Sequence, residues 1–254
     1  MKIALFSDIH ANLPALTAFF EDLETKKVDA MYCLGDLVGY NIWPNEVVNE
    51  IIKRKIPCIA GNYDFGIGRN INDCGCAYKT EEDKENGAVS IRFTNSLMGV
   101  SERKYLRTLP SHINLEFKLN DDESVNLLLV HGSPRKINEY LFEDRSEESM
   151  LRIMKEANAD ILCFGHTHKP YHKILENGSK FKHAINIGSI GKPKDGNPLG
   201  GYVIINLNET LSLREKNALE VEFVRFEYDI EQAASAIEIS SLPNAYAESL
   251  RTGN

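Results

Sequence analysis

Short apolar runs alternate with amphipathic stretches along the first third of the chain. The runs at 3–6, 31–34 and 56–60 are almost uninterrupted by polar residues, which is typical of strands buried on both faces. Between them, residues 13–23 and 44–54 repeat apolar positions at helical spacing, which predicts two amphipathic helices. This β-α-β-α-β order predicts a parallel sheet with right-handed crossovers.

The rest of the chain begins with an irregular segment and then becomes rich in strands. Residues 65–110 are irregular and then helical from about 79 to 109, so we expect an insertion there. The later pattern predicts strands at 113–119, 125–130, 161–164, 171–176, 180–187, 201–207 and 220–228, helices at 146–156 and 230–251, and turns at 120–122 and 177–178. No repeat or linker divides the sequence, so we expect one domain over residues 1–254.

Composition and charge narrow the class of protein. The 254 residues are 43% hydrophobic and 26% charged, as in an ordinary globular protein with a sizeable core. The net charge of −8 argues against a general nucleic-acid binder, which usually needs a basic face. The first apolar stretch is too short for a signal peptide, and no apolar run approaches the roughly 18 residues of a membrane span. We therefore expect a cytoplasmic protein without a membrane partner.

The five cysteines predict reduced thiols. Cys33, Cys58 and Cys163 lie in apolar runs, where a thiol behaves as a small buried hydrophobe. Cys74 and Cys76 are too close in sequence for ordinary disulfide geometry. We interpret this pair as part of a loop or helix start, with a soft-metal or redox role as the alternative.

Residues that bind divalent metals follow the apolar runs in five short blocks. The blocks are Asp8-Ile9-His10, Gly35-Asp36-Leu37-Val38-Gly39, Gly61-Asn62-Tyr63-Asp64, His131-Gly132 and Gly165-His166-Thr167-His168. They hold three carboxylates, one amide and four of the seven histidines, a mixed oxygen and nitrogen set that suits borderline divalent metals. Because ligands gather at the carboxyl ends of parallel strands, we expect a metal centre there, covered by the 65–110 insertion.

Each block taken alone has a structural explanation. Asp-x-His at a strand end is often a capped turn, and Gly-Asp occurs in many turns. Gly165-His166-Thr167-His168 is more specific, because two histidines at a strand end seldom serve packing. All five blocks in this order favour a centre of two metals, which can clamp a phosphoryl group and activate water. We interpret His112, His172 and His183, which lie outside the blocks, as structural or surface residues.

The ordered blocks resemble the calcineurin-like metallophosphoesterases. That family's pattern is D-x-H, G-D-x-x-G, G-N-H-D or G-N-H-E, a later H, and G-H-x-H, and all five parts match over residues 8–168. The match extends through 186–193, and residues 8–12 are similar to the compact single-domain bacterial and archaeal phosphodiesterases and to the diadenosine-tetraphosphatase-like branch. The resemblance implies an α/β (α+β) fold: a four-layer α/β/β/α sandwich of two mixed β-sheets flanked by helices.

The resemblance also implies a dinuclear hydrolase of phosphoester bonds in small-molecule or nucleotide substrates, in which a metal-activated hydroxide attacks phosphorus. The two divalent metals would be Mn, Fe, Zn or similar. One metal would be held by Asp8, His10 and His168, and the other by Asn62, His131 and His166, with Asp36 bridging them. The catalytic set would be Asp36, Asn62, Tyr63 and Asp64, and the substrate contacts would be Asn12, Asn62 and Tyr63.

Tyr63 departs from the family pattern, which often has His at this position. That His is the usual candidate to protonate the leaving oxygen or bind phosphate. With an ordinary pKa near about 10, a tyrosine is a poorer acid at neutral pH, so we expect a preference for good leaving groups. Asp64 would then lose its usual partner while still able to support the Asn62 loop.

Other functions compatible with the blocks are less favoured. A dinucleoside polyphosphate hydrolase is the main alternative within the same chemistry. A protein-binding scaffold is disfavoured because unused ligands would leave buried carboxylates unpaired. The acidic charge disfavours a nuclease. Arg69, which follows the Gly61-Asn62-Tyr63-Asp64 block, gives little support for a protein phosphatase.

Overall fold

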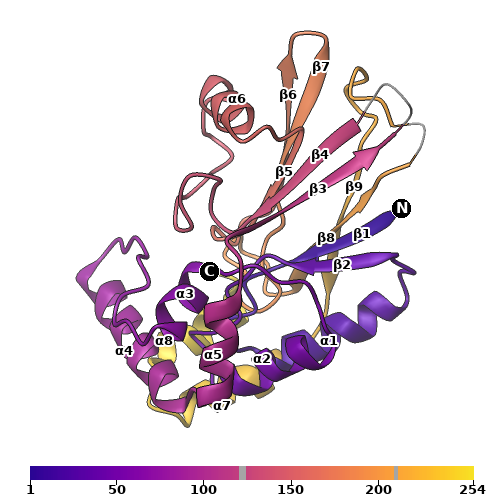
Figure 1. Cartoon of the computed structure of the whole chain (residues 1–254). Coiled ribbons are helices and arrows are strands. Elements are labelled where there is room, and N and C mark those ends of the chain that lie inside the picture. The colour runs from indigo at the N-terminus through magenta and orange to yellow at the C-terminus, as the bar shows by residue number, and fades with distance from the viewer. Residues whose placement is uncertain (120–123, 209–210) are drawn as a thin grey trace.

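Two mixed β-sheets lie face to face between layers of helices (Figure 1). The computed structural model describes residues 1–119, 124–208 and 211–254. The expected turn at 120–122 lies outside the described residues. The predicted four-layer sandwich of two mixed sheets flanked by helices is confirmed.

The first sheet joins the two ends of the chain. Its strand order is β2-β1-β8-β9, with β1 (Lys2–Phe6), β2 (Ala30–Cys33), β8 (Gly200–Asn206) and β9 (Glu220–Phe226). The β1–β2 pair is parallel, as the sequence predicted, whereas β8 runs antiparallel to both β1 and β9.

The second sheet is built from the middle of the chain. Its order is β3-β4-β5-β7-β6, with β3 (His112–Lys118), β4 (Ser124–Val130), β5 (Ile161–Phe164), β6 (Tyr171–Asn177) and β7 (Lys180–Asn186). The β4–β5 and β5–β7 pairs are parallel, so the carboxyl ends of β4 and β5 lie at the same edge.

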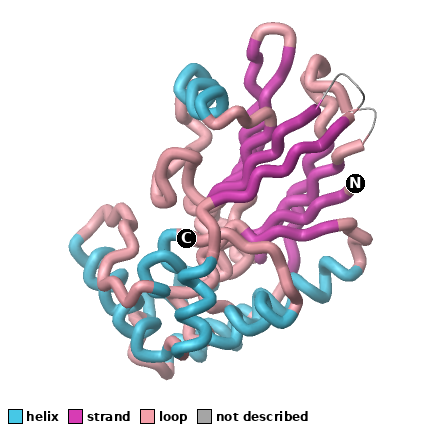
Figure 2. The backbone as a smooth tube through the Cα atoms, in the orientation of Figure 1, coloured by secondary structure: helices cyan, strands magenta, loops and turns pink. Residues whose placement is uncertain are grey.

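The helices divide unequally between the two outer faces (Figure 2). Helix α6 (Glu147–Glu156) packs against the second sheet. The others lie on the side of the first sheet: α1 (Leu13–Glu24), α2 (Pro44–Lys53), α3 (Asn62–Gly68), α4 (Glu81–Leu97), α5 (Val100–Thr108), α7 (Ile230–Glu238) and α8 (Asn244–Thr252). None of the described helices combines the length and apolar character that crossing a bilayer requires.

Strand β1 shows how the layers are joined. Its side chains alternate between faces: Ala4 and Phe6 belong to the core beneath the helices, and Ile3 and Leu5 to the core between the sheets. All four are fully buried, and burying a large apolar side chain contributes about 1.5–3 kcal/mol. A strand with no solvated face explains why its sequence is an apolar run.

The structure corrects four sequence predictions and adds one helix. The expected strand at 56–60 is reduced to one bridge between Cys58 and Cys33. The expected helix at 79–109 is two helices, interrupted where Met98 and Gly99 adopt extended backbone. The tail at 230–251 also holds two helices, and the helix α3 was not predicted. The β6–β7 hairpin is confirmed, but its turn falls one residue later, since Asn177 pairs with Lys180.

Candidate metal centre

The five sequence blocks converge at one junction between the sheets. Asp8 and Asp36 follow β1 and β2 of the first sheet, whereas His131 follows β4, and His166 and His168 follow β5, of the second sheet. Each of these side chains is buried, with at most 4% of its surface exposed. The centre is therefore assembled from both sheets.

The backbone at these positions leaves extended geometry. Positive φ angles occur at Asp8 (54°), His10 (49°), Asp36 (54°), His166 (65°) and His168 (58°). Such angles are uncommon outside glycine, and each sparsely populated conformation costs on the order of 1–3 kcal/mol. This strain at the predicted ligand positions indicates that the surrounding fold holds the side chains in a functional arrangement.

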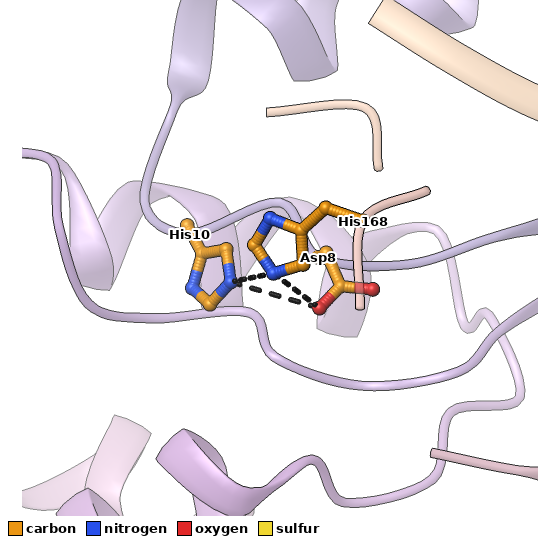
Figure 3. A group of neighbouring side chains, drawn as sticks. All are labelled: Asp8, His10 and His168. Atoms are coloured by element: carbon orange, nitrogen blue, oxygen red, sulfur yellow. Dashed lines mark hydrogen bonds and ion pairs between the residues drawn. The ribbon is translucent and has the colours of Figure 1, made fainter. Parts of the chain in front are cut away.

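The first group consists of Asp8, His10 and His168 (Figure 3). The Nε2 atoms of His10 and His168 face each other at 3.2 Å. Asp8 Oδ1 lies 3.1 Å from His168 Nε2 and 3.6 Å from His10 Nε2. Three potential ligand atoms thus point at one small volume.

The second group consists of Asp36, His131 and His166, with Asn62 beside it. His131 Nε2 lies 3.3 Å from Asp36 Oδ2 and 3.2 Å from Asn62 Oδ1. The His131 and His166 rings are 5.1 Å apart between centroids. The amide of Asn62 is oriented by its Nδ2, which donates to the Cys74 carbonyl oxygen at 2.8 Å, so that Oδ1 is left toward His131.

Asp36 lies between the two groups. Its Oδ2 is 3.3 Å from His131 in the second group and 3.6 Å from His10 in the first. Its Oδ1 accepts a hydrogen bond from Tyr63 N at 2.9 Å, which fixes the orientation of the carboxylate. This placement is compatible with a carboxylate shared between the two groups.

Main-chain carbonyl groups orient three of the imidazoles. The Nδ1 atoms of His10, His131 and His168 lie 3.0, 2.8 and 2.5 Å from the carbonyl oxygens of Val38, Leu34 and Lys192, respectively. If Nδ1 donates to a carbonyl, the proton is absent from Nε2, which then presents a lone pair to the centre. These partners could not be found from sequence, because a carbonyl acceptor leaves no residue-type signal.

Electrostatics in the two groups are dominated by burial and by mutual contact of carboxylates and imidazoles. Burial disfavours the charged form of His131, but Asp36 and Asp8 more than offset this and raise its pKa to about 10. Burial lowers the pKa of His166 to about 4 and of His168 to about 3. The latter two imidazoles are therefore neutral at pH 7, the form in which histidine binds metal.

The donor set fits two divalent cations. Asp8 Oδ1 and His166 Nε2 are buried without a properly directed hydrogen-bond partner among the described residues. Buried polar atoms normally have partners, so atoms left open at one point indicate a ligand there. Two His/Asp triads of oxygen and nitrogen atoms are consistent with a dinuclear metal site.

The start of α3 supports the Asn62 loop. The Asp64 carboxylate accepts hydrogen bonds from Gly61 N and Leu37 N, each at 2.9 Å, tying the loops after β2 and before α3 together. Burial and the neighbouring Asp36 raise the Asp64 pKa to about 7. These contacts favour the supporting role expected for Asp64 over a direct chemical one.

Asn12 and Tyr63, two of the predicted substrate contacts, have different surroundings. Asn12 caps α1: its Oδ1 accepts from Ala15 N at 3.1 Å and its Nδ2 donates to the Gly191 carbonyl oxygen at 2.9 Å. Both amide groups are thus engaged, which favours a structural role. Tyr63 is 1% exposed, and its hydroxyl is buried with no well-directed hydrogen-bond partner among the described residues. Burial raises the Tyr63 pKa well above its usual value, which further weakens it as an acid.

Residues outside the blocks behave largely as expected. The cysteines are free, and only Cys76 is more than slightly exposed. His172 and His183 pair across β6 and β7, with His172 Nε2 2.9 Å from His183 Nδ1, in keeping with a structural role. The sequence did not identify Ser7, whose Oγ donates to Asp8 Oδ2 at 2.5 Å and leaves Oδ1 for the centre.

Comparison with known proteins agrees with this geometry. The calcineurin-like phosphoesterase superfamily domain matches residues 1–210. An uncharacterised protein of Methanocaldococcus jannaschii is 31% identical over 265 residues, covering 99% of this chain and 98% of that protein. A UDP-2,3-diacylglucosamine hydrolase of Coxiella burnetii is 26% identical over 217 residues, covering 73% of this chain and 88% of that protein.

Solved structures share the whole fold. A metallophosphoesterase from Sphaerobacter thermophilus is 25% identical with a TM-score of 0.74, covering 100% of this chain and 99% of that one. A hypothetical protein from Pyrococcus horikoshii is 24% identical with a TM-score of 0.77, covering 100% of this chain and 98% of that one. The chain therefore belongs to the calcineurin-like phosphoesterase superfamily and is a metal-dependent phosphoesterase.

Proposed function

We propose that the protein hydrolyses small-molecule or nucleotide phosphoesters with two divalent metals. Asp8, His10 and His168 would hold one metal, and Asn62, His131 and His166 the other, with Asp36 shared between them. The observation that carries the proposal is the position of Asp36 Oδ2, within 3.3 Å of one group and 3.6 Å of the other. When bound, the metals activate water and neutralise charge on the phosphoryl oxygens.

The protein's own residues orient the reacting groups. Carbonyl acceptors fix the rings of His10, His131 and His168, so these rings need no reorientation on binding. His131, whose pKa is raised to about 10, releases a proton when it binds metal. Asp64 holds the loop that presents Asn62. Tyr63 would act by position, since a buried phenol cannot readily release or exchange a proton at neutral pH.

The 65–110 segment is proposed to cover the site. The Cys74 carbonyl contacts Asn62 directly, and Cys76 Sγ lies 3.4 Å from Asn62 Nδ2. Similarity to UDP-2,3-diacylglucosamine hydrolases supports a nucleotide-linked substrate within this reaction class. A dinucleoside polyphosphate is the alternative of the same kind.

Metal content and hydrolysis test the proposal together. We expect close to two ions of Mn, Fe or Zn per chain by elemental analysis, together with hydrolysis of bis(4-nitrophenyl) phosphate. Asp36→Asn should lower the content of both metals and reduce kcat/KM by about a hundred-fold or more, because a bridging carboxylate serves both ions. His112→Ala is the matched control, since His112 is exposed and outside the centre, and it should change neither.

The same experiment separates hydrolase from scaffold. A protein that uses this fold only as a binding surface would show no metal-dependent turnover after metal supply. Metal content near zero with no activity regained, or equal behaviour of Asp36→Asn and His112→Ala, would contradict the ligand assignment.

A further inference from the structure

A pocket of about 370 Å³ opens beside the metal centre. This is within the range of about 300–1,000 Å³ typical of small-ligand sites. Its walls are aromatic and cationic and come from distant parts of the chain: Tyr40, Tyr78, Tyr140, Lys192, Lys194 and Tyr246. None of these residues belongs to the five sequence blocks.

The pocket walls are in contact with the proposed metal ligands. The contacts are Tyr40 to His10 (ring centroids 4.8 Å apart), Tyr140 to His166 (ring centroids 4.2 Å apart), Cys76 to Asn62 (Sγ to Nδ2, 3.4 Å) and Lys194 N to the His168 carbonyl oxygen (3.4 Å). If the phosphorus of a substrate lies between the two triads, the rest of the substrate can therefore extend into this pocket.

The amino groups of two lysines share one wall of the pocket, and burial lowers the pKa of both. The Nζ atoms of Lys192 and Lys194 lie 5.2 and 5.9 Å from the centre of the Tyr40 ring. Lys192 is only 5% exposed, and its Nζ donates to Ser249 Oγ at 2.5 Å. Within the described part of the chain, neither ammonium is paired with a carboxylate.

Among the described residues, the other acidic groups nearby form no ion pair with either lysine. Ser249 Oγ, which accepts from Lys192, donates in turn to the main-chain oxygen of Asn254, and the Asp8 and Asp36 carboxylates of the metal centre act on Lys194 only at longer range. The Asp83 carboxylate is engaged at the start of α4, where it accepts from Thr80 N at 3.2 Å. Lys79 adds a further positive charge to the lining. Burying an ammonium without a counter-charge costs free energy, which a bound anion would offset. A cationic hollow in a protein of net charge −8 is a place where anions concentrate.

The aromatic rings provide the remaining surface. The Tyr246 ring packs edge-on against Tyr40, with centroids 5.1 Å apart, and Lys192 Nζ lies 5.4 Å from its centre. Tyrosine faces stack planar rings, and base stacking on an aromatic side chain is worth about 1–3 kcal/mol. The same pocket thus offers a stacking surface and a positive charge.

We propose that this pocket binds the part of the substrate beyond the reacting phosphate and selects an aromatic ring that carries a second anionic group. A nucleotide bearing an additional phosphate has this chemistry. The inference rests on the proposed phosphoesterase function, because it places the reacting phosphate at the metal centre.

Three esters with the same leaving group test the selection. They are methyl 4-nitrophenyl phosphate, thymidine 5′-(4-nitrophenyl phosphate) and thymidine 3′-phosphate 5′-(4-nitrophenyl phosphate), which add first the ring and then the second anion. For the metal-loaded protein, we expect kcat/KM to rise along this series, with the second phosphate adding about ten-fold, as a charge-assisted hydrogen bond does. Release of 4-nitrophenolate is the readout.

Variants test which residues cause the two expected increases in kcat/KM. Lys194→Gln should bring the ratio of the last two esters close to one, and Tyr246→Leu should reduce the ratio of the first two. Lys155→Gln removes an exposed lysine on α6 and is the matched control for charge, so both ratios should persist. Ratios within one variant are insensitive to changes in overall activity or folded fraction.

Calorimetric titration with thymidine 3′,5′-bisphosphate gives a second readout that needs no turnover. Wild type and Lys155→Gln should bind it about ten-fold more tightly than Lys194→Gln. Ratios near one in wild type, or equal ratios in Lys194→Gln, would overturn the selection while leaving the hydrolase intact. If none of the three esters is hydrolysed, the proposed function fails, and the titration alone then decides whether the pocket binds this ligand.

Discussion

Replacing Tyr63 by phenylalanine should separate the stability of the site from its activity. The Tyr63 side chain is 1% exposed, and its ring packs 4.8 Å from Tyr40 and 5.4 Å from His10 between centroids. Among the described residues its hydroxyl has no well-directed hydrogen-bond partner, although the side chains of Tyr40, Cys76 and Tyr78 lie close enough to interact with it. Phenylalanine keeps the ring contacts and removes only this unpaired oxygen.

The magnitude follows from the burial of that oxygen. A hydroxyl buried without a hydrogen bond costs about 1–3 kcal/mol in proteins. Removing the oxygen removes this cost, but it leaves a void the size of one oxygen, which is itself destabilising. We therefore expect a net increase of about 1 kcal/mol in the free energy of unfolding. For a chain of this size, that corresponds to a Tm increase of about 2–4 °C.

The activity should respond in the opposite direction, and modestly. If Tyr63 only positions phosphate, Tyr63→Phe should lower kcat/KM on aryl esters by about ten-fold or less. Tyr63→His restores the residue that the family often has, and an imidazole with a pKa near about 6.5 is a competent acid at pH 7. It should therefore improve alkyl ester hydrolysis selectively.

Thermal melts and kinetics on aryl and alkyl phosphate esters, with wild type alongside both variants, measure these effects. A Tm that falls on Tyr63→Phe would show that the hydroxyl is hydrogen-bonded in the folded protein, and the reasoning from burial would be wrong. An equal effect of Tyr63→His on both ester classes would mean that position 63 is not where the leaving oxygen is protonated. A thousand-fold loss in Tyr63→Phe would make the hydroxyl essential.

Two further predictions concern stability. Asn12→Ala should lower the free energy of unfolding, measured by chemical denaturation, by about 0.5–2 kcal/mol, because it removes the cap of α1. KM should stay within about two-fold of wild type. A large rise in KM in samples with the same folded fraction would restore the substrate role of Asn12. In protein from which a chelator has removed the metals, Tm should be highest at about pH 6.5, the pKa of histidine in the unfolded chain. Burial disfavours charged His131 but Asp36 raises its pKa to about 10, so the stability that it contributes below about 6.5 is lost as pH rises toward 10. Burial lowers the pKa of His166 to about 4 and that of His168 to about 3, so their contribution to stability is lost as pH drops below about 6.5. Asp64, whose pKa burial raises to about 7, partly opposes this loss, because the folded protein binds its proton more tightly than the unfolded chain does. A Tm that rises steadily to pH 9 would contradict this.

The sequence was sufficient for most strands and for bringing the candidate ligands together, because both depend on local pattern. An apolar run such as 161–164 has to be buried on both faces, and the residue that follows it has to emerge at an edge of the sheet. Asp8 and His168 could therefore be grouped before their contact was known, although 160 positions separate them in the chain.

What the sequence did not provide depends on tertiary contacts. Helix α3 contains Gly66 and Gly68, which have poor helix propensity, and it forms because Asp64 caps its start and Ile67 is buried. The 56–60 run has strand-like residues, but Pro57 lacks an amide donor, and only Cys58 bridges to β2. Lys192 and Tyr246 meet only because α8 packs beside the loop after β7, which no periodicity encodes.

The origin of the ligands in both sheets has a consequence for the order of folding. Asp8 and Asp36 follow two strands that lie near the start of the chain and pair with each other. His166 and His168, in contrast, become available only once β5 has joined the second sheet. Closing such a long loop is entropically costly, so the complete ligand set forms only when the two sheets dock. Metal would therefore bind after the sheets have docked and would slow their separation. Its expected effect is to lower the unfolding rate of the native state rather than to raise the folding rate.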